Sequence, residues 1–297
     1  MNAPLGTHTP LVDHSAASRH GGKLIGAILM EEGRLSTADR DRVLHLAEEH
    51  GLRFGDAAKR LKMLSEDDIQ FALARQFDYF RVTPGRSMLS GELIAAYEPN
   101  STAAEGLRAL RSQLMLRWFG ASARHQTLAV VSADRGEGRS WVAANLAIVF
   151  SQLGERTLLI DADLRNPRQH SLFGLNNAVG LSSLLTGRRA ESCVQRIPQL
   201  RDLSILPAGM IPPNPQELLS RPFFDMLLGE IRKQYDVILI DTPAAADNAD
   251  AQTISARAGS AILVTQKDTS RTTRVRRVLT DIRETGAQVV GSVLSKH

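Results

Sequence analysis

Short apolar segments separated by helical sequence are the strongest constraint on the fold of this chain. Most of these segments hold three or more consecutive apolar residues, without the polar alternation that marks a strand with one face in water. They occupy residues 127–132, 157–163, 203–209, 235–241, 260–265 and 288–294. Apolar strands joined by helices are typical of a mostly parallel sheet buried on both faces. We therefore predict an α/β fold with ligands at the carboxyl ends of the strands.

The first segment runs into a glycine-rich turn, Ala133 to Ser140, and then into a helical stretch that begins WVAANLAIVF. A strand, a glycine-rich turn and a helix start form the layout in which backbone N–H groups and the positive helix end hold phosphate. The turn departs twice from the G-x-x-x-x-G-K-[ST] pattern, because Ala133 replaces the first glycine and Arg139 replaces the lysine. Taken alone, it fits an ordinary glycine turn equally well.

Acidic residues at the ends of two further segments favour the phosphate interpretation. The stretch LLIDADLR contains Asp161 and Asp163, and VILIDTP contains Asp241. A carboxylate directly after a buried strand is costly unless it is hydrated, paired or bound to metal. Beside a triphosphate, a carboxylate and the Ser140 hydroxyl would hold Mg²⁺, and a second carboxylate could take a proton from an attacking hydroxyl. Three such elements in this order predict a P-loop nucleotide site.

The N-terminal third holds an internal repeat. The stretch that starts at Ile25 aligns with the one that starts at Phe54 with an offset of 29 residues. Each unit reads as a short helix, a turn, a serine N-cap at position 36 or 65 with an aspartate three residues later, and a second helix. Two such hairpins predict a small all-helical module.

The domain plan follows from these patterns. A length of 297 residues favours two domains. We predict a flexible lead over residues 1–20, the helical double repeat over 21–82, a linker over 83–102 and the P-loop domain over 103–297. The net charge of +4 does not imply a nucleic-acid partner, and a single cysteine, Cys193, fits a reducing compartment. With no apolar run long enough for a membrane span or signal peptide, we expect a cytoplasmic protein.

The motifs resemble those of the bacterial tyrosine kinases from about Ala103 to Leu294. The turn ADRGEGRS resembles their deviant P-loop, LLIDADLR their Asp-rich second Walker motif, and VILIDTP their Walker B motif. The resemblance implies ATP and Mg²⁺ as cofactors, with Asp161, Asp163 and Arg139 as catalytic residues and Asp161 as the base for the tyrosine hydroxyl. It implies that the nucleotide is bound by Gly136, Glu137, Gly138, Arg139, Ser140 and Trp141, and Mg²⁺ by Ser140, Asp163 and Asp241.

One departure from the family pattern leaves a question open, and one related group of ATPases is disfavoured. Arg139 keeps the charge of the lysine but not its compact ammonium, so ATP binding is expected while turnover stays open. The related switch ATPases that position division sites carry a signature lysine. At the matching position this chain has Asp134, which argues against membership of that group.

A helix upstream of the P-loop resembles the E-x-x-R-x-x-R helix with which the family builds a ring of subunits. Here its residues are Glu105, Arg108 and Arg111. A spacing of three places them along one helix face. This face could contact a neighbouring subunit, or it could simply be a charged stripe exposed to solvent. The resemblance therefore implies a homo-oligomeric ring.

The whole chain most resembles the EpsG type of chain-length determinant protein tyrosine kinase. This resemblance implies an ATP-Mg-dependent tyrosine kinase that regulates exopolysaccharide chain length, polymerisation and export with a separate membrane co-polymerase, and that associates with the inner membrane through this partner. The chain has only three tyrosines, so we expect no autophosphorylation of a C-terminal tyrosine cluster. The alternative is a nucleotide-gated assembly factor of the export machinery with little or no kinase activity.

The helical repeat resembles the cyclic-di-GMP-binding module of some secretion and pilus ATPases. The second unit matches that module at Arg53, Gly55 and Gln76, whereas the first unit is eroded. Cyclic-di-GMP binding is therefore one prediction for this module, and a docking role without nucleotide is the other.

Overall fold

The computed structural model describes residues 24–76, 87–121, 125–187 and 193–295. The chain divides into two compact units, Met1–Tyr79 and Phe80–His297. The flexible lead predicted over residues 1–20 and the predicted boundary at residue 82 lie outside the described residues. None of the helices in the described part of the chain combines the length and apolar character that crossing a bilayer requires.

The N-terminal unit consists of two helical hairpins, α1 (Ile25–Glu31) with α2 (Thr37–His50) and α3 (Phe54–Arg60) with α4 (Glu66–Gln76). The two predicted serine caps form. The Ser36 and Ser65 side chains accept the backbone N–H groups of Asp39 and Asp68, each at 3.1 Å. The Ser65 N–H in turn donates to the Asp68 carboxylate at 3.0 Å, which completes a capping box.

Two glycines at equivalent repeat positions allow the hairpins to pack closely. A Cβ atom on Gly26 would lie 3.3 Å from the ring of Phe54, and one on Gly55 would lie 3.2 Å from the side chain of Ile69. Both distances are tighter than ordinary van der Waals contact. The glycines of this repeat therefore have a packing reason that is independent of any ligand.

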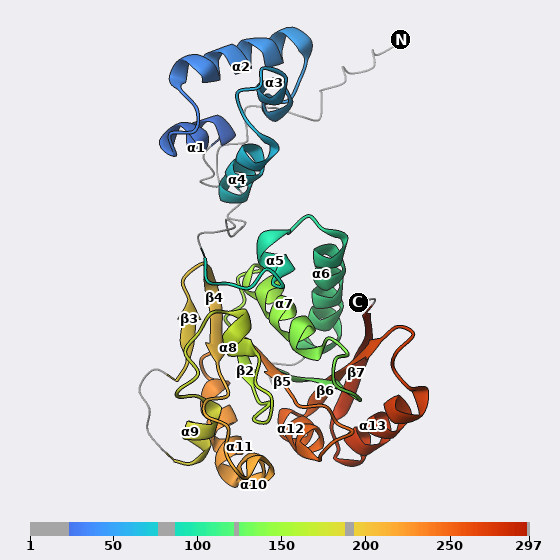
Figure 1. The fold of residues 1–297 in the computed structure, drawn as a ribbon. Coiled ribbons are helices and arrows are strands. Elements are labelled where there is room, and N and C mark those ends of the chain that lie inside the picture. Colours follow the sequence, from blue (N-terminus) through green and yellow to red (C-terminus); the bar gives the residue numbers. More distant parts are fainter. Residues whose placement is uncertain (1–23, 77–86, 122–124, 188–192, 296–297) are drawn as a thin grey trace, which may run out of the picture. The chain divides into compact units, whose positions relative to one another are not determined.

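The second unit is built on a seven-stranded sheet of order β3-β4-β2-β5-β1-β6-β7 (Figure 1). All neighbouring strands are parallel except β3 and β4. The strands are β1 (Thr127–Ser132), β2 (Thr157–Asp161), β3 (Gln195–Ile197), β4 (Leu200–Leu206), β5 (Val237–Asp241), β6 (Ser260–Gln266) and β7 (Gln288–Ser295). Each of the six predicted segments overlaps a strand, which confirms the α/β fold, whereas the three-residue β3 was not predicted.

Helices cover both faces of this sheet, as Figure 1 shows. One face carries α5 (Ile94–Tyr97), α6 (Thr102–Leu114), α7 (Arg139–Ser151) and α8 (Gln169–Leu172), with a π-helix, Met115–Phe119, continuing α6. The other carries α9 (Leu181–Leu185), α10 (Pro215–Ser220), α11 (Pro222–Ile231), α12 (Asp250–Ala258) and α13 (Thr272–Glu284). Alternate residues of β1 feed the two cores, because Leu128 and Val130 face the first set of helices while Ala129 and Val131 face the second.

The linker predicted over residues 83–102 is wrong for most of its described part. Leu93 and the α5 residues Ala95 and Ala96 are fully buried in the core of the second unit. Asn145, which interrupts the apolar face of α7, accepts the Ala95 N–H at 3.0 Å and donates to the Glu92 carbonyl at 3.1 Å. The sequence suggested a linker because this segment has no long helix of its own. Side chains of α7 and its C-cap, Asn145 and Gln152, pair with its backbone groups instead.

Candidate functional site

The glycine-rich turn joins β1 to α7 and lines a pocket at the carboxyl end of the sheet. Gly136 and Gly138 have φ values of +81° and +85°, which glycine adopts without strain. Gly138 is the N-cap of α7, so the positive end of this helix faces the turn. The pocket, of about 290 Å³, is lined by Arg135, Gly136, Glu137, Gly138, Arg139, Ser140, Asp163, Asn166, Arg168, Pro243, Ala244, Asp247 and Asn248.

Three buried carboxylates lie beside this turn because β2 and β5 are neighbours that end together. Asp161 and Asp241 are register partners on these strands and are 0% exposed, while Asp163 is 4% exposed. The Asp161 oxygens accept backbone N–H groups from Asp163 at 3.3 Å, Arg168 at 3.0 Å and Gln169 at 2.9 Å. Of the three carboxylates, Asp163 lies on the pocket wall, and Asp161 lies one step deeper.

Burial makes the deeper carboxylates weaker acids. Burial, and next the charge of Asp241, raise the pKa of Asp161 well above its usual range, against the backbone N–H groups that it accepts. Burial likewise raises the pKa of Asp241, but the charge of Arg139 opposes this shift. A carboxylate with a raised pKa is better matched to accepting a proton near neutral pH than an exposed aspartate.

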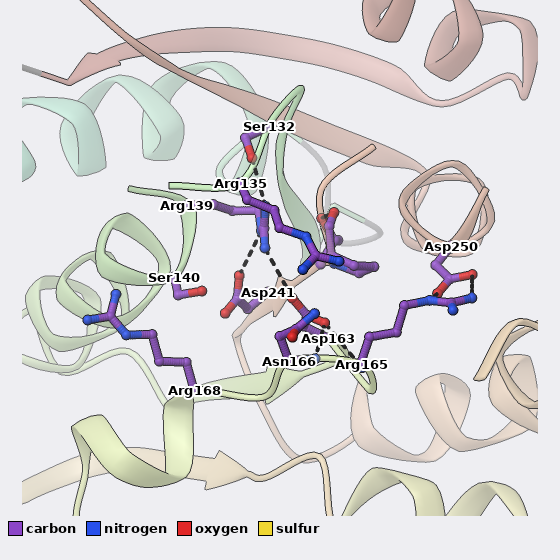
Figure 2. Close-up of polar contacts among 12 residues, drawn as sticks. Ser132, Arg135, Arg139, Ser140, Asp163, Arg165, Asn166, Arg168, Asp241 and Asp250 are labelled. Atoms are coloured by element: carbon purple, nitrogen blue, oxygen red, sulfur yellow. Dashed lines mark hydrogen bonds and ion pairs between the residues drawn. The ribbon is translucent and has the colours of Figure 1, made fainter. Parts of the chain in front are cut away.

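The Arg139 guanidinium pairs with two of these carboxylates, Asp163 and Asp241, and connects them to β1 (Figure 2). It donates from Nε to Asp241 at 3.3 Å, from Nη2 to Asp163 at 3.2 Å and from Nη1 to the Ser132 hydroxyl at 2.7 Å. The Arg139 residue is 8% exposed. The side chain predicted to contact phosphate therefore neutralises the acidic residues that are predicted to hold Mg²⁺.

A second set of contacts ties the turn to the start of α13. The Glu137 carboxylate, 2% exposed, accepts the Asp134 N–H at 2.8 Å and the Ser270 hydroxyl. Arg274 of α13 forms an ion pair with Asp134. Sequence reasoning read Glu137 only as a backbone position of the nucleotide site, and no pattern indicated that its side chain points inward.

Three further residues of the site were missed. Gln169 donates from Nε2 to Asp241 at 2.7 Å and to the Ser140 carbonyl at 3.1 Å. The carboxylate of Asp250, at the start of α12, is fully buried and accepts Arg165 at 2.8 Å. Arg168 pairs with Glu92 through both carboxylate oxygens, at 2.8 and 2.6 Å. All three pairs join segments that are far apart in sequence, so no local spacing could have indicated them.

The arrangement of donors fits Mg²⁺ held together with a phosphate ligand. In the described residues no group of three or more His, Cys, Asp or Glu side chains is arranged to hold a metal alone. Mg²⁺ takes few protein ligands and keeps waters and substrate phosphates, so a hydroxyl and two carboxylates beside a phosphate-binding turn suffice. Gln169 Oε1 is also buried without a hydrogen-bond partner among the described groups.

The remaining predicted residues lie elsewhere. Trp141 packs against the core on the α5–α7 side. On α6, Arg108 pairs with Glu105 at 2.7 Å and donates to the Pro99 carbonyl at 2.6 Å, and Arg111 donates to the Val149 carbonyl at 2.8 Å.

In the N-terminal unit the predicted ligand residues are only partly described. Arg53 is exposed at the N-cap of α3. Gly55 contacts Ile69, as described above. The side chain of Gln76 lies outside the described part of the structure.

The sequence of this chain is similar to a family of P-loop NTPases and to bacterial tyrosine kinases. The family described as ParA, NUBPL iron-transfer P-loop NTPase, matches residues 123–295. The tyrosine-protein kinase YwqD of Bacillus subtilis is 36% identical over 216 residues, which are 71% of this chain and 90% of that protein.

Solved structures agree with this sequence comparison. The kinase domain of the Escherichia coli tyrosine kinase ETK superposes with a TM-score of 0.67 at 28% identity, covering 73% of this chain and 84% of that one. The chimeric protein CapA2B2 superposes with a TM-score of 0.65 at 32% identity, covering 78% and 99% of the two chains.

Proposed function

Because this chain belongs to the bacterial tyrosine kinases, within the ParA-type P-loop NTPases, we propose that it regulates exopolysaccharide chain length, polymerisation and export by phosphorylating tyrosines. The observation that carries the proposal is the meeting of the glycine-rich turn with Asp161, Asp163 and Asp241 at the ends of adjacent strands. Phosphoryl transfer relies on positioning and charge neutralisation, and this arrangement supplies both.

The roles within the site follow from position. We propose that backbone N–H groups from Gly136 to Ser140, at the positive end of α7, bind the phosphates of ATP. Ser140, Asp163 and Asp241 would hold Mg²⁺, which neutralises the charge that develops on the phosphates. Arg139 would leave the carboxylates and pair with phosphate when nucleotide is bound.

We propose Asp161 as the group that takes the proton of the acceptor tyrosine. The raised pKa of its carboxyl supports this role, since a general base works best when its pKa lies near the working pH. The position of Asp163 on the pocket wall makes it the competing candidate. Asp161→Asn should abolish transfer and spare nucleotide affinity, whereas Asp163→Asn should weaken Mg²⁺-dependent binding as well.

The surroundings of the reaction are also proposals. A membrane co-polymerase would be a separate polypeptide that holds this chain at the cytoplasmic side of the inner membrane, as the resemblance of the whole chain suggests. Glu105, Arg108 and Arg111 would form a ring by exchanging their contacts within the chain for contacts with a neighbouring subunit. For the N-terminal unit, a docking role is favoured over cyclic-di-GMP binding, since Gly55 is needed for packing.

A second candidate function is a nucleotide-gated assembly factor with little kinase activity. The observation in its favour is the Arg139 guanidinium, which occupies the carboxylates that catalysis requires. The iron transfer in the family description is not supported here, because iron–sulfur clusters need several thiolates and the chain has one cysteine, Cys193.

Incubation of the purified chain with labelled ATP, Mg²⁺ and the cytoplasmic segment of its co-polymerase separates the two candidates. The kinase proposal requires phosphotyrosine on the partner in wild type and none with Asp161→Asn. Nucleotide binding and nucleotide-dependent oligomers without any phosphotyrosine would favour the assembly factor. Repeating the assay without residues 1–82 tests whether the N-terminal unit is needed for docking.

A further inference from the structure

Gln169 contacts three parts of the site: the end of β2, the end of β5 and the start of α7. It belongs to none of the motifs from which the site was predicted. The residue opens the short helix α8, eight positions after Asp161, and is 0% exposed. Its backbone N–H donates to Asp161 at 2.9 Å, and its side-chain Nε2 donates to Asp241 at 2.7 Å and to the Ser140 carbonyl at 3.1 Å. One residue thus contacts both acidic strand ends and the first turn of α7.

The orientation of the Gln169 carboxamide is fixed by what surrounds it. A carboxylate oxygen and a backbone carbonyl are both acceptors, so only the NH₂ end of the amide can face them. The Asp241 oxygen that Gln169 engages is Oδ2, while Arg139 engages Oδ1. The Gln169 amide therefore holds one oxygen of Asp241 in place and leaves the other for a cation.

The Oε1 atom of the same amide is buried and accepts no hydrogen bond from the described groups. A residue without the acceptor atom Oε1 could make an equally good structural contact between a loop and a strand. Retaining a polar atom without a partner in a closed site is costly unless a ligand or water donates to it. Gln152, at the far end of α7, carries the same feature, so what sets Gln169 apart is its contact with both acidic strand ends.

From these contacts we infer that Gln169 is a positioning residue for Mg²⁺: it orients the Asp241 carboxylate relative to Ser140 so that the metal and the nucleotide bind together. The inference rests on the proposed nucleotide site and does not require transfer to tyrosine. Outer-shell groups that orient metal ligands typically change metal affinity or activity by 10–100-fold.

The test measures the affinity of a fluorescent ADP for the full chain in Mg²⁺ and in EDTA. Gln169→Met keeps the length of the side chain and removes both hydrogen-bonding atoms, and Gln169→Glu keeps the shape but replaces the donor by an acceptor. Gln152→Met is the matched control. Gln152, at the far end of α7, also donates to a backbone carbonyl, that of Ala95 at 2.9 Å, and its Oε1 is likewise buried with no hydrogen-bond partner in the part of the chain that the structure describes.

We expect both Gln169 variants to lose about tenfold or more of the affinity gained on adding Mg²⁺, with affinity in EDTA within about twofold of wild type. Gln152→Met should retain the full gain. An unchanged Mg²⁺ gain in either folded Gln169 variant would overturn the inference, and so would an equal loss in Mg²⁺ and EDTA, which marks a structural role. Wild type that binds Mg²⁺-ADP without phosphorylating tyrosine would refute the kinase proposal and leave Gln169 in its role.

Discussion

Replacing Arg139 by lysine tests whether this side chain competes with the metal. In the structure Arg139 bridges Asp163, Asp241 and Ser132 through three different nitrogen atoms. A lysine offers a single ammonium on a flexible stem, which cannot span all three acceptors at once. Mg²⁺ that approaches Asp163 and Asp241 must displace whichever cation is there, so the lysine variant should release the site more easily.

The size of the effect follows from the contacts. Hydrogen bonds to charged groups contribute about 1.5–3 kcal/mol each, and lysine would keep one of the two carboxylate contacts. Removing the other lowers the cost of displacement by about 1.5–3 kcal/mol, and each 1.4 kcal/mol corresponds to about a tenfold change in an equilibrium constant. We therefore expect the Mg²⁺ concentration for half-maximal nucleotide turnover to fall by about 10-fold to 100-fold in Arg139→Lys.

The assay is a Mg²⁺ titration of phosphate release at fixed ATP, with Arg156→Lys as the control. Arg156 also pairs with a carboxylate through two of its nitrogen atoms, here with Asp236 alone, but it lies at the opposite end of β2. That control should titrate like wild type. A half-maximal Mg²⁺ concentration in Arg139→Lys that equals or exceeds the wild-type value would refute the competition between guanidinium and metal.

Three further predictions concern the stability of the protein without nucleotide and metal. Burial raises the pKa of Asp161, so this carboxyl favours folding below its unfolded pKa of about 4 and loses that contribution as the pH rises through its folded value. Asp161→Asn should therefore raise the Tm at pH 7 and change it little near pH 4 in scanning calorimetry; a lower Tm at pH 7 would contradict this. Asn145→Leu removes the partners of the Ala95 N–H and the Glu92 carbonyl and should cost about 3 kcal/mol in urea unfolding; a loss under about 1 kcal/mol would mean that α5 needs no such anchor. Gly180→Ala would place a Cβ 2.1 Å from the Pro207 carbonyl and should cost at least about 2 kcal/mol by the same measurement, whereas Gly229→Ala, with open space around it, should not destabilise.

The strands could be predicted because their signal is local. Six apolar segments between helices identified six of the seven strands and the parallel sheet. Burial on both faces demands continuous apolar sequence, except at the edge strand β7, where no residue is buried. The three-residue β3, with only Ile197 buried, carries no such signal. The segment before α6 was misread because it is buried by contacts with residues far away in sequence, such as the one between Ala95 and Asn145, 50 residues apart.

The same distinction separates the predicted and the missed parts of the site. The positions of Asp161, Asp163 and Asp241 could be predicted because Asp161 and Asp241 end their strands and Asp163 lies two residues beyond one. The order of the strands then brings them together. Gln169 lies in a four-residue helix whose sequence resembles any surface turn. The contact of Gln169 with Asp241 arises because β5 lies beside β2 in the sheet. This strand order cannot be read from the sequence around Gln169.

Arg139 shows why a motif predicts a residue's position more reliably than its partner. Buried carboxylates need a compensating positive charge, and a guanidinium at the start of α7 can reach Asp163 and Asp241 as well as a phosphate. In the structure the acidic strand ends pair with Arg139, the same side chain that we propose as a phosphate ligand. In the proposed mechanism, binding of nucleotide and metal would require one exchange, in which Arg139 would move to phosphate and Mg²⁺ would take its place. Both candidate functions pass through this exchange, so the Mg²⁺ dependence of Arg139→Lys bears on either.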